Sequence, residues 1–326
     1  MKKVLSLILA LAMVFALVAC GEKQPSNDGN TDGDKSARGN VIMTFGTADT
    51  GGSMYPAGAA VSQVWTNNVE GVKCNTQTST GSFQNCQDVS TGEVDVAVAT
   101  SDVVLNAYNG TGKFADIGKL DNLRVIGAVY TSVLSGVTLK SSGLTYIHDL
   151  LGKRVAVGPA ASATENATLA AFGVMGIDSS NTSLENLGLG DGADSVGDGI
   201  LDAAFGFAGL PIGGQLNLAA TKEIQVLDMT QEEIDKVLAG NAAYIQTKIP
   251  AGTYTGQDND ANTFGVKCLI IVTADMDADL VYDLCKAMNE HTEELAAGNA
   301  LLKDMTDPSF LCTQMPIPLH DGAQKY

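Results

Sequence analysis

The sequence predicts an α/β protein of two lobes that are joined by two long strands. Short β-type runs alternate with helical segments five times, which is the order of parallel βαβ units. A β run at 123–139 is too long for a single strand in one lobe, so it crosses into the second lobe, and a run at 263–273 crosses back. Because the crossings are far apart in the sequence, both chain ends contribute to lobe 1. Lobe 1 is therefore predicted to comprise residues 41–131 with 260–326, and lobe 2 residues 132–259.

The first strand-to-helix unit shows the feature that the rest of the chain repeats. Residues 41–45 are apolar and predict a strand, and a loop rich in glycine and hydroxyl residues follows. Pro56 lies in the first turn of the next helical pattern, where its missing N–H costs little. Such a turn points free backbone N–H groups at one place and attracts anions. The loop matches neither a dinucleotide nor a P-loop motif, and an ordinary strand-to-helix turn is the alternative interpretation.

Four further units repeat this arrangement along the chain. The predicted strands are 71–78, 94–99, 153–157 and 202–207, and the predicted helices are 83–90, 103–108, 163–175 and 212–220. In open α/β sheets, ligands bind beyond the carboxyl ends of the strands, which is where the connecting loops lie. We therefore expect a ligand site made of Thr47, Asp49, Gly52, Ser53, Tyr55, Ser79, Gly81, Ser82, Thr100, Ser101, Ser162, Thr164 and Gly209.

The amino terminus has the pattern of an exported lipoprotein. Two lysines precede an apolar run, 4–18, that is short for a membrane-spanning helix. The run ends in Leu-Val-Ala-Cys-Gly, which resembles a bacterial lipobox with Cys20 as the lipidated residue. Residues 1–20 are thus predicted to be a lipoprotein signal peptide, with a plain secretory signal as the alternative. Residues 21–40 contain almost no apolar side chains and predict a flexible tether.

Charge and motif content exclude several classes of function. The formal net charge of −18 argues against nucleic-acid binding and against adhesion to anionic lipid. The three histidines lie in separate segments, and no hydrolase, metalloprotease or zinc motif is present. The acidic residues between Asp191 and Asp202 fail the EF-hand spacing and are interpreted as turn and cap residues. We expect no catalysis, no metal and no cofactor.

Five cysteines remain once Cys20 is assigned to lipid, so at least one thiol is unpaired or bonds between molecules. Cys74 and Cys86 are near each other in the sequence and could form a disulfide. A pair of buried free thiols is an equally open interpretation.

Six motifs in the same order resemble the TAXI family, the solute-binding proteins of one class of TRAP transporters. They lie at 45–56, 79–82, 92–110, 149–158, 249–254 and 318–323. The resemblance implies a two-lobed periplasmic-binding-protein fold of the type that hinges on two strands. It also implies that the protein captures a small organic acid or amino acid outside the cell and delivers it to a TRAP-type membrane permease. We expect the protein to be a monomer.

The chain departs from that family in its binding loops, most consequentially at Asp49. A carboxylate beside a bound anion is unfavourable, so Asp49 must point away or pair with a positive group on the ligand. A glutamate-like ligand fits the second option. Lys and Arg are scarce near the loops, which predicts that helix starts and hydroxyls hold the carboxylate, with Arg124 in a structural role. The alternatives are a binding lipoprotein of an ABC importer, and an extracytoplasmic enzyme or surface antigen.

Overall fold

A computed structural model describes residues 39–326, so the predicted signal peptide, Cys20 and nearly all of the predicted tether lie outside the described residues. The strands are β1 (Val41–Gly46), β2 (Val72–Gln77), β3 (Val96–Thr100), β4 (Leu123–Leu139), β5 (Arg154–Ala156), β6 (Ser183–Glu185), β7 (Ala203–Ala208), β8 (Ile224–Val226), β9 (Ile245–Ile249) and β10 (Ala261–Thr273).

The α-helices are α2 (Met54–Asn68), α3 (Ser82–Thr91), α4 (Ser101–Asn109), α5 (Ala163–Val174), α6 (Leu189–Gly197), α7 (Gly213–Thr221), α8 (Gln231–Gly240), α9 (Ala278–Glu290), α10 (Thr292–Gly298), α11 (Pro308–Cys312) and α12 (Asp321–Lys325). Four 3-10 helices lie at η1 (Gly112–Phe114), η2 (Lys140–Ser142), η3 (Ile147–Leu150) and η4 (Ala300–Thr306). All five predicted strand-to-helix units are present, with boundaries within a few residues of those expected.

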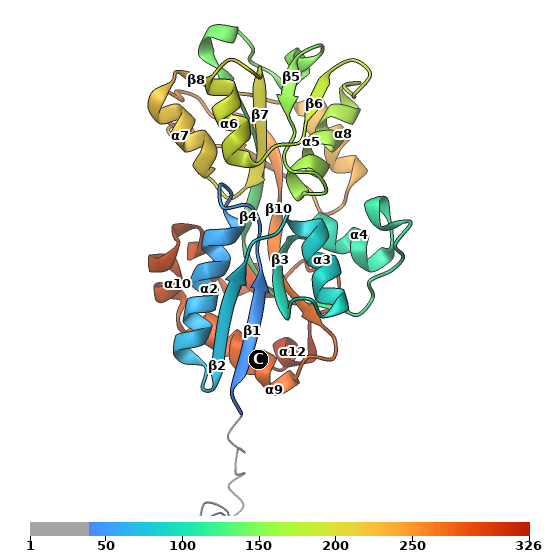
Figure 1. The fold of residues 1–326 in the computed structure, drawn as a ribbon, viewed down its shortest axis with the longest axis vertical. Coiled ribbons are helices and arrows are strands. Elements are labelled where there is room, and N and C mark those ends of the chain that lie inside the picture. Colours follow the sequence, from blue (N-terminus) through green and yellow to red (C-terminus); the bar gives the residue numbers. More distant parts are fainter. Residues whose placement is uncertain (1–38) are drawn as a thin grey trace, which may run out of the picture. The chain divides into compact units, whose positions relative to one another are not determined.

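The strands form one continuous sheet in the order β2-β1-β3-β10-β4-β7-β5-β6, with β8 on β4 and β9 on β10. The long strands β4 and β10 are antiparallel to each other and run through both lobes, as Figure 1 shows. The first half of β4 pairs with β10, whereas its second half pairs with β7 and β8. The expected α/β fold of two lobes with two crossing strands is therefore confirmed, while the exact lobe boundaries stay a prediction.

A glycine makes the close pairing of the crossing strands possible. A Cβ built on Gly265 would lie 2.4 Å from the carbonyl oxygen of Ser132, closer than any real Cβ contact. Two register shifts follow in the same ladder, between Cys268 and Leu269 and between Ile270 and Ile271. Such irregularities bend and twist a strand pair locally, and here they lie on the lobe-1 side of the crossing.

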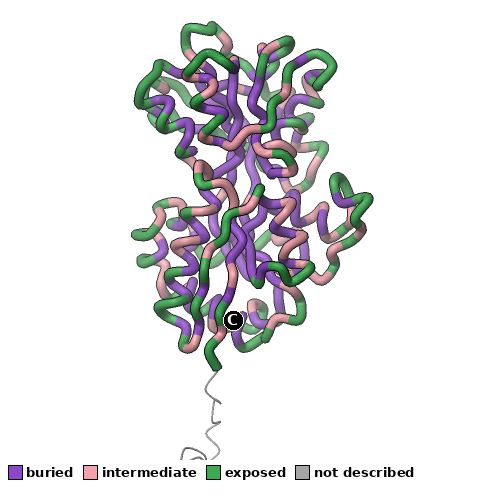
Figure 2. The backbone as a smooth tube through the Cα atoms, viewed as in Figure 1, coloured by how far each residue is buried: buried purple, intermediate pink, exposed green. Residues whose placement is uncertain are grey.

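Both chain ends build the core of lobe 1. Trp65 of α2 is fully buried, and its ring stacks on Phe45 of β1 with centroids 5.5 Å apart. The indole N–H of Trp65 donates to the carbonyl oxygen of Leu284 in α9 at 3.1 Å. This bond joins segments that lie 219 residues apart in the sequence. Figure 2 shows that the buried residues are concentrated along the strands of both lobes.

Acidic residues lie at the starts of several helices, and one prediction about them needs correction. The helix α9 ends at Glu290, and a separate helix, α10, begins at Thr292. Asp277 does cap α9, because its carboxylate accepts the N–H of Leu280 at 2.7 Å. Asp191 and Asp194, interpreted as turn and cap residues, lie within α6, where Asp191 in the first turn interacts favourably with the helix dipole.

Candidate ligand-binding site

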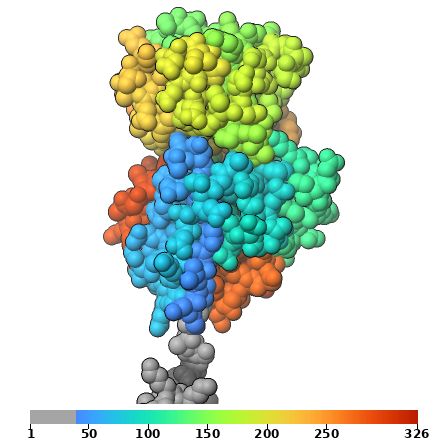
Figure 3. Space-filling model, viewed as in Figure 1, coloured from blue at the N-terminus to red at the C-terminus, as the bar shows by residue number. Residues whose placement is uncertain are grey.

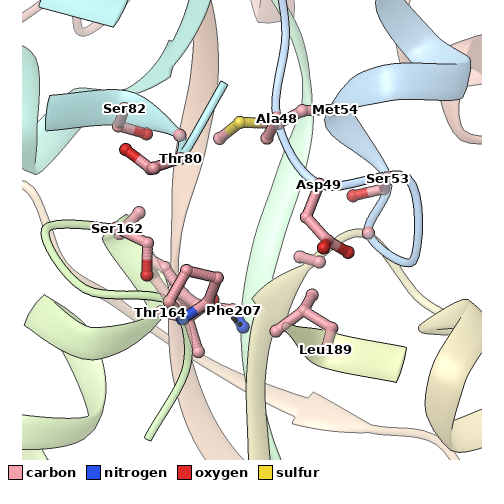
Figure 4. Close-up of a pocket in the computed structure, with 15 residues that line it drawn as sticks. Ala48, Asp49, Ser53, Met54, Thr80, Ser82, Ser162, Thr164, Leu189 and Phe207 are labelled. Carbon is pink, nitrogen blue, oxygen red and sulfur yellow. Dashed lines mark hydrogen bonds between the residues drawn. The ribbon is translucent and has the colours of Figure 1, made fainter. Parts of the chain in front are cut away.

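A pocket lies between the lobes, beyond the carboxyl ends of β1, β2, β5 and β7. Its free space is about 380 Å³ when the part that is open to solvent is included. Its walls come from the β1–α2 and β2–α3 loops of lobe 1 and from the starts of α5 and α6 and the end of β7 in lobe 2 (Figure 4). Figure 3 shows the lobes touching above the β1–α2 loop, where a Cβ on Gly51 would lie 3.0 Å from the N–H nitrogen of Gly190.

Seven of the thirteen predicted residues line this pocket. They are Asp49, Gly52, Ser53, Gly81, Ser82, Ser162 and Thr164. They belong to three separate turns, β1–α2, β2–α3 and β5–α5, which the sheet brings together because the parallel strands of each lobe end at the same edge.

Three of these hydroxyl groups are arranged to donate. Ser82 Oγ accepts the N–H of Thr100 at 3.1 Å, Ser162 Oγ accepts the N–H of Glu165 at 3.1 Å, and Thr164 Oγ1 accepts the N–H of Phe207 at 3.1 Å. Ser82 Oγ also accepts the hydroxyl hydrogen of Thr100 at 3.4 Å. A hydroxyl has one hydrogen to donate, and in all of these bonds to described protein groups the hydroxyl oxygen of the three side chains is the acceptor. All three side chains are buried. The pocket therefore presents three O–H donors whose natural partner is an acceptor on a ligand.

Helix starts add to this donor-rich wall. Ser82 is the first residue of α3, and Ser162 is the N-cap of α5, with the β-region backbone and the side-chain bond that such a cap has. The first N–H groups of a helix lack partners within the helix, and the dipole favours negative charge there. The Ser162–Glu165 cap follows from the spacing that the sequence shows.

The other predicted residues lie behind the pocket wall or beside it. Thr47 Oγ1 donates to the carbonyl oxygen of Gln77 at 2.7 Å, and Ser79 Oγ donates to the carbonyl oxygen of Thr47 at 2.9 Å. Their hydroxyls thus tie the first two loops together instead of facing the cavity. The residues that do not line the pocket are Thr47, Tyr55, Ser79, Thr100, Ser101 and Gly209.

Sequence reasoning missed the apolar part of the lining. Leu189 enters from the start of α6, and Phe207 and Ala208 enter from the end of β7. No periodic signal marks such residues, because they line a pocket only through the way the two lobes pack. The remaining missed residues are Ala48, Met54, Thr80, Pro159 and Ala163.

Three polar contacts hold the lobes against each other around the pocket. Ser53 Oγ accepts the N–H of Gly209 at 2.7 Å and donates to the hydroxyl of Tyr130 on β4 at 3.1 Å. Lys113 pairs with Glu165 across the lobes. Burial alone would raise the pKa of Glu165, but the hydrogen bonds from Lys113 and from a backbone N–H outweigh it and hold the pKa below its ordinary value.

The third contact is a buried carboxylate. Asp102 of α4 is fully buried, and its Oδ2 accepts hydrogen bonds from Asn166 Nδ2 at 2.8 Å and from the Tyr244 hydroxyl at 3.2 Å, both on lobe 2. Its Oδ1 has no hydrogen-bond partner among the described residues. Burial raises the pKa of Asp102 above its ordinary value, although these hydrogen bonds oppose the shift.

The described part of the chain holds no group of three or more His, Cys, Asp or Glu side chains arranged to bind a metal ion. All five described cysteines are free thiols, four of them buried, so Cys74 and Cys86 do not form the disulfide left open above. Within residues 39–326, no helix is both long enough and apolar enough to cross a membrane. Arg124 lies away from the pocket and donates to the carbonyl oxygens of Asp121 and Leu123.

Comparison with known proteins agrees with this architecture. Residues 45–326 match the model of the NMT1-like family. The chain belongs to that family. Because the match covers both lobes and every residue that lines the pocket, the pocket lies within the region that this NMT1-like chain shares with its family.

Solved structures show what fold this NMT1-like chain has. An ancestral arginine-binding protein bound to arginine matches with a TM-score of 0.50 and 11% identity, over 83% of this chain and 100% of that one. The substrate-binding protein of an amino acid ABC transporter matches with a TM-score of 0.48 and 14% identity, over 82% of this chain and 99% of that one. The periplasmic aliphatic sulphonate binding protein of Escherichia coli matches with a TM-score of 0.45 and 12% identity, over 81% of this chain and 76% of that one. The first of these likenesses shows the periplasmic-binding-protein fold.

Proposed function

We propose that this protein is an extracytoplasmic solute-binding protein, anchored through Cys20, that captures a small carboxylate or amino acid for a TRAP-type permease. The observation that carries the proposal is the set of three buried hydroxyls in the interlobe pocket, on Ser82, Ser162 and Thr164. Each already accepts a backbone N–H and keeps its own hydrogen for a ligand. Such donors suit a carboxylate, which only accepts hydrogen bonds.

The magnitudes are sufficient for binding without an arginine. A hydrogen bond to a charged group contributes roughly 1.5–3 kcal/mol, and a nearby helix start adds about 0.3–1 kcal/mol. Three such hydroxyl bonds approach the roughly 8 kcal/mol of a micromolar complex, and the helix starts of α3 and α5 offset part of the freedom lost on binding. The net charge of the chain therefore does not exclude an acidic ligand.

The pocket favours binding over catalysis. Its described lining consists of hydroxyls, one carboxylate, glycines and apolar side chains, with no histidine, cysteine or lysine to act as a base or nucleophile. A pocket between two lobes joined by two strands suits capture by closure of the lobes. The TRAP assignment rests on the six motifs that resemble the TAXI family. A gene for a large TRAP membrane subunit beside this one would support it, and a gene for an ABC permease would favour the importer alternative.

Calorimetry tests the binding proposal directly. The ligands are glutamate, glutamine, 2-oxoglutarate and succinate, and the proteins are the wild type, Ser82→Ala and Arg124→Ala. We expect Ser82→Ala to weaken carboxylate binding by roughly 10-fold or more, and Arg124→Ala to change it less than about threefold. Thr91→Ala, at the exposed far end of the same helix α3, is the matched control. If Arg124→Ala alone abolished binding of every ligand, the hydroxyl account would be wrong.

A further inference from the structure

The side chain of Asp49 is fixed inside the pocket and directed at lobe 2. It leaves the β1–α2 loop and points toward Leu189, on the opposite side of the pocket from Ser82 and Ser162 (Figure 4). Its Oδ1 accepts the N–H of Gly51 at 2.7 Å, which holds the carboxylate in place. Its Oδ2 lies 2.9 Å from where a Cβ on Gly188 would be, at the N-cap of α6. The sequence left open whether Asp49 points away, and the structure places it in the lining.

The surroundings of this carboxylate hold negative charge and no cation. None of the described residues that line the pocket is lysine, arginine or histidine. The adjoining pocket is bordered by Lys113, but that ammonium pairs with Glu165. Asp191 Oδ2 lies 3.4 Å from the same Gly188 position, so a second carboxylate is near Asp49. Asp49 is half-buried and Asp191 is exposed, and two neighbouring carboxylates repel each other unless a positive group compensates them.

We propose that Asp49 selects ligands that carry a positively charged nitrogen, so that the ligand is a zwitterion. Its ammonium meets Asp49 Oδ2, and a carboxylate at its other end meets the hydroxyls of Ser82, Ser162 and Thr164. The inference rests on the proposed function, because it uses the same pocket and the same donors. Dicarboxylates and oxo acids would place a second negative or neutral group against Asp49, and we expect the pocket to reject them.

A structural role for Asp49 makes a different prediction. If its carboxylate served only to interact with the start of α6 when the lobes close, its removal would lower the affinity for every ligand by the same factor. A charge-selecting role instead couples the effect of the substitution to the charge of the ligand. A cycle that changes the protein charge and the ligand charge separately distinguishes the two.

The experiment is calorimetry with two ligand pairs on the wild type and Asp49→Asn. Glutamate and 2-oxoglutarate differ at the ammonium, and 5-aminovalerate carries a protonated aminomethyl group in place of one carboxylate of glutarate. We expect the wild type to prefer the ammonium-bearing member of each pair, and Asp49→Asn to reduce that preference roughly 10- to 100-fold. Asp194→Asn, an exposed carboxylate on α6 with the same change of charge, is the control and should leave the preference unchanged.

Several outcomes would overturn the inference and leave the proposed function standing. These are an equal loss for both members of a pair in Asp49→Asn, a wild-type preference for 2-oxoglutarate or glutarate, and a co-purifying carboxylate without a basic nitrogen. The wild-type preference and the mass spectrum of the co-purifying molecule require no variant, so a folding defect in Asp49→Asn does not remove the test. If the wild type binds none of these ligands, and what co-purifies is not a carboxylate, the proposed function fails instead.

Discussion

Lobe closure should depend on pH through Asp102. This carboxylate is fully buried between the lobes and has no cation partner among the described residues, and burial raises its pKa. When the lobes separate, Asn166 and Tyr244 withdraw and water reaches Asp102, so its pKa returns toward the ordinary value of about 3.9. The closed form therefore binds a proton more tightly than the open form. Protonation of Asp102 therefore stabilises the closed form to its full extent at a pH below the pKa that Asp102 has in the open form. This stabilisation is lost as the pH rises through the pKa that Asp102 has in the closed form.

The other titratable groups around Asp102 do not change charge over the relevant range. Burial raises the pKa of Cys268 to about 12, and burial also raises the pKa values of Cys86 and Tyr244. The pKa of Glu165 is lowered, so it stays charged with Lys113. Asp102 is thus the described group at this contact whose protonation should follow lobe closure, at pH values above the ordinary carboxyl pKa.

The size of the pH effect on lobe closure follows from the binding of one proton to Asp102. The ratio of closed to open protein falls by at most about tenfold for each pH unit between the two pKa values, or about 1.4 kcal/mol per unit. The affinity for a bound amino acid should therefore fall, by at most about tenfold per pH unit, as the pH rises through the pKa that Asp102 has in the closed form. The helix start of α4 and the two hydrogen bonds oppose the shift and make the slope shallower.

Calorimetry in buffers of different ionisation enthalpy measures both the affinity and the protons taken up on binding. We expect proton uptake in the wild type, and neither uptake nor pH dependence in Asp102→Asn, which keeps the shape without the charge. Tyr244→Phe removes one hydrogen bond to the carboxylate, so it should raise the closed-form pKa further and extend the pH dependence upward. Equal pH dependence in the wild type and Asp102→Asn would refute the reasoning.

Three further predictions concern the anchor, the hinge and the core. Cys20→Ser should leave the protein without lipid, and labelled fatty acid on that variant would contradict the lipobox interpretation. If β4 and β10 act as hinges, saturating ligand should reduce the radius of gyration in X-ray scattering; an unchanged profile would indicate a rigid protein. Trp65→Ala should lower the free energy of unfolding by roughly 3–5 kcal/mol in denaturant titrations, and a loss under about 1 kcal/mol would show that its stacking and hydrogen bond are unimportant.

The sequence by itself determined the alternation of strands and helices, the two crossing strands and the donor character of the turns. These features are local: apolar runs form strands, and the Ser162–Glu165 spacing caps a helix whatever lies opposite. For the same reason Ser82, Ser162 and Thr164 could be proposed from their positions after strands. The direction of a loop side chain is not local, so Thr47 and Ser79 were expected in the pocket but bond to the loops behind it.

Only the tertiary structure decided which residues face each other across the lobes. Leu189 and Phe207 reach the pocket because α6 and β7 of lobe 2 close over lobe 1, and no sequence period records that approach. The sequence could not decide where Asp49 points. The Gly51 N–H that holds it is local, but Gly188, which its carboxylate faces, belongs to the other lobe. In the sequence alone, Asp102 is likewise indistinguishable from an ordinary acidic residue in the first turn of a helix. Its burial and unpartnered oxygen arise when Asn166 and Tyr244, 64 and 142 residues away, pack against it and exclude water.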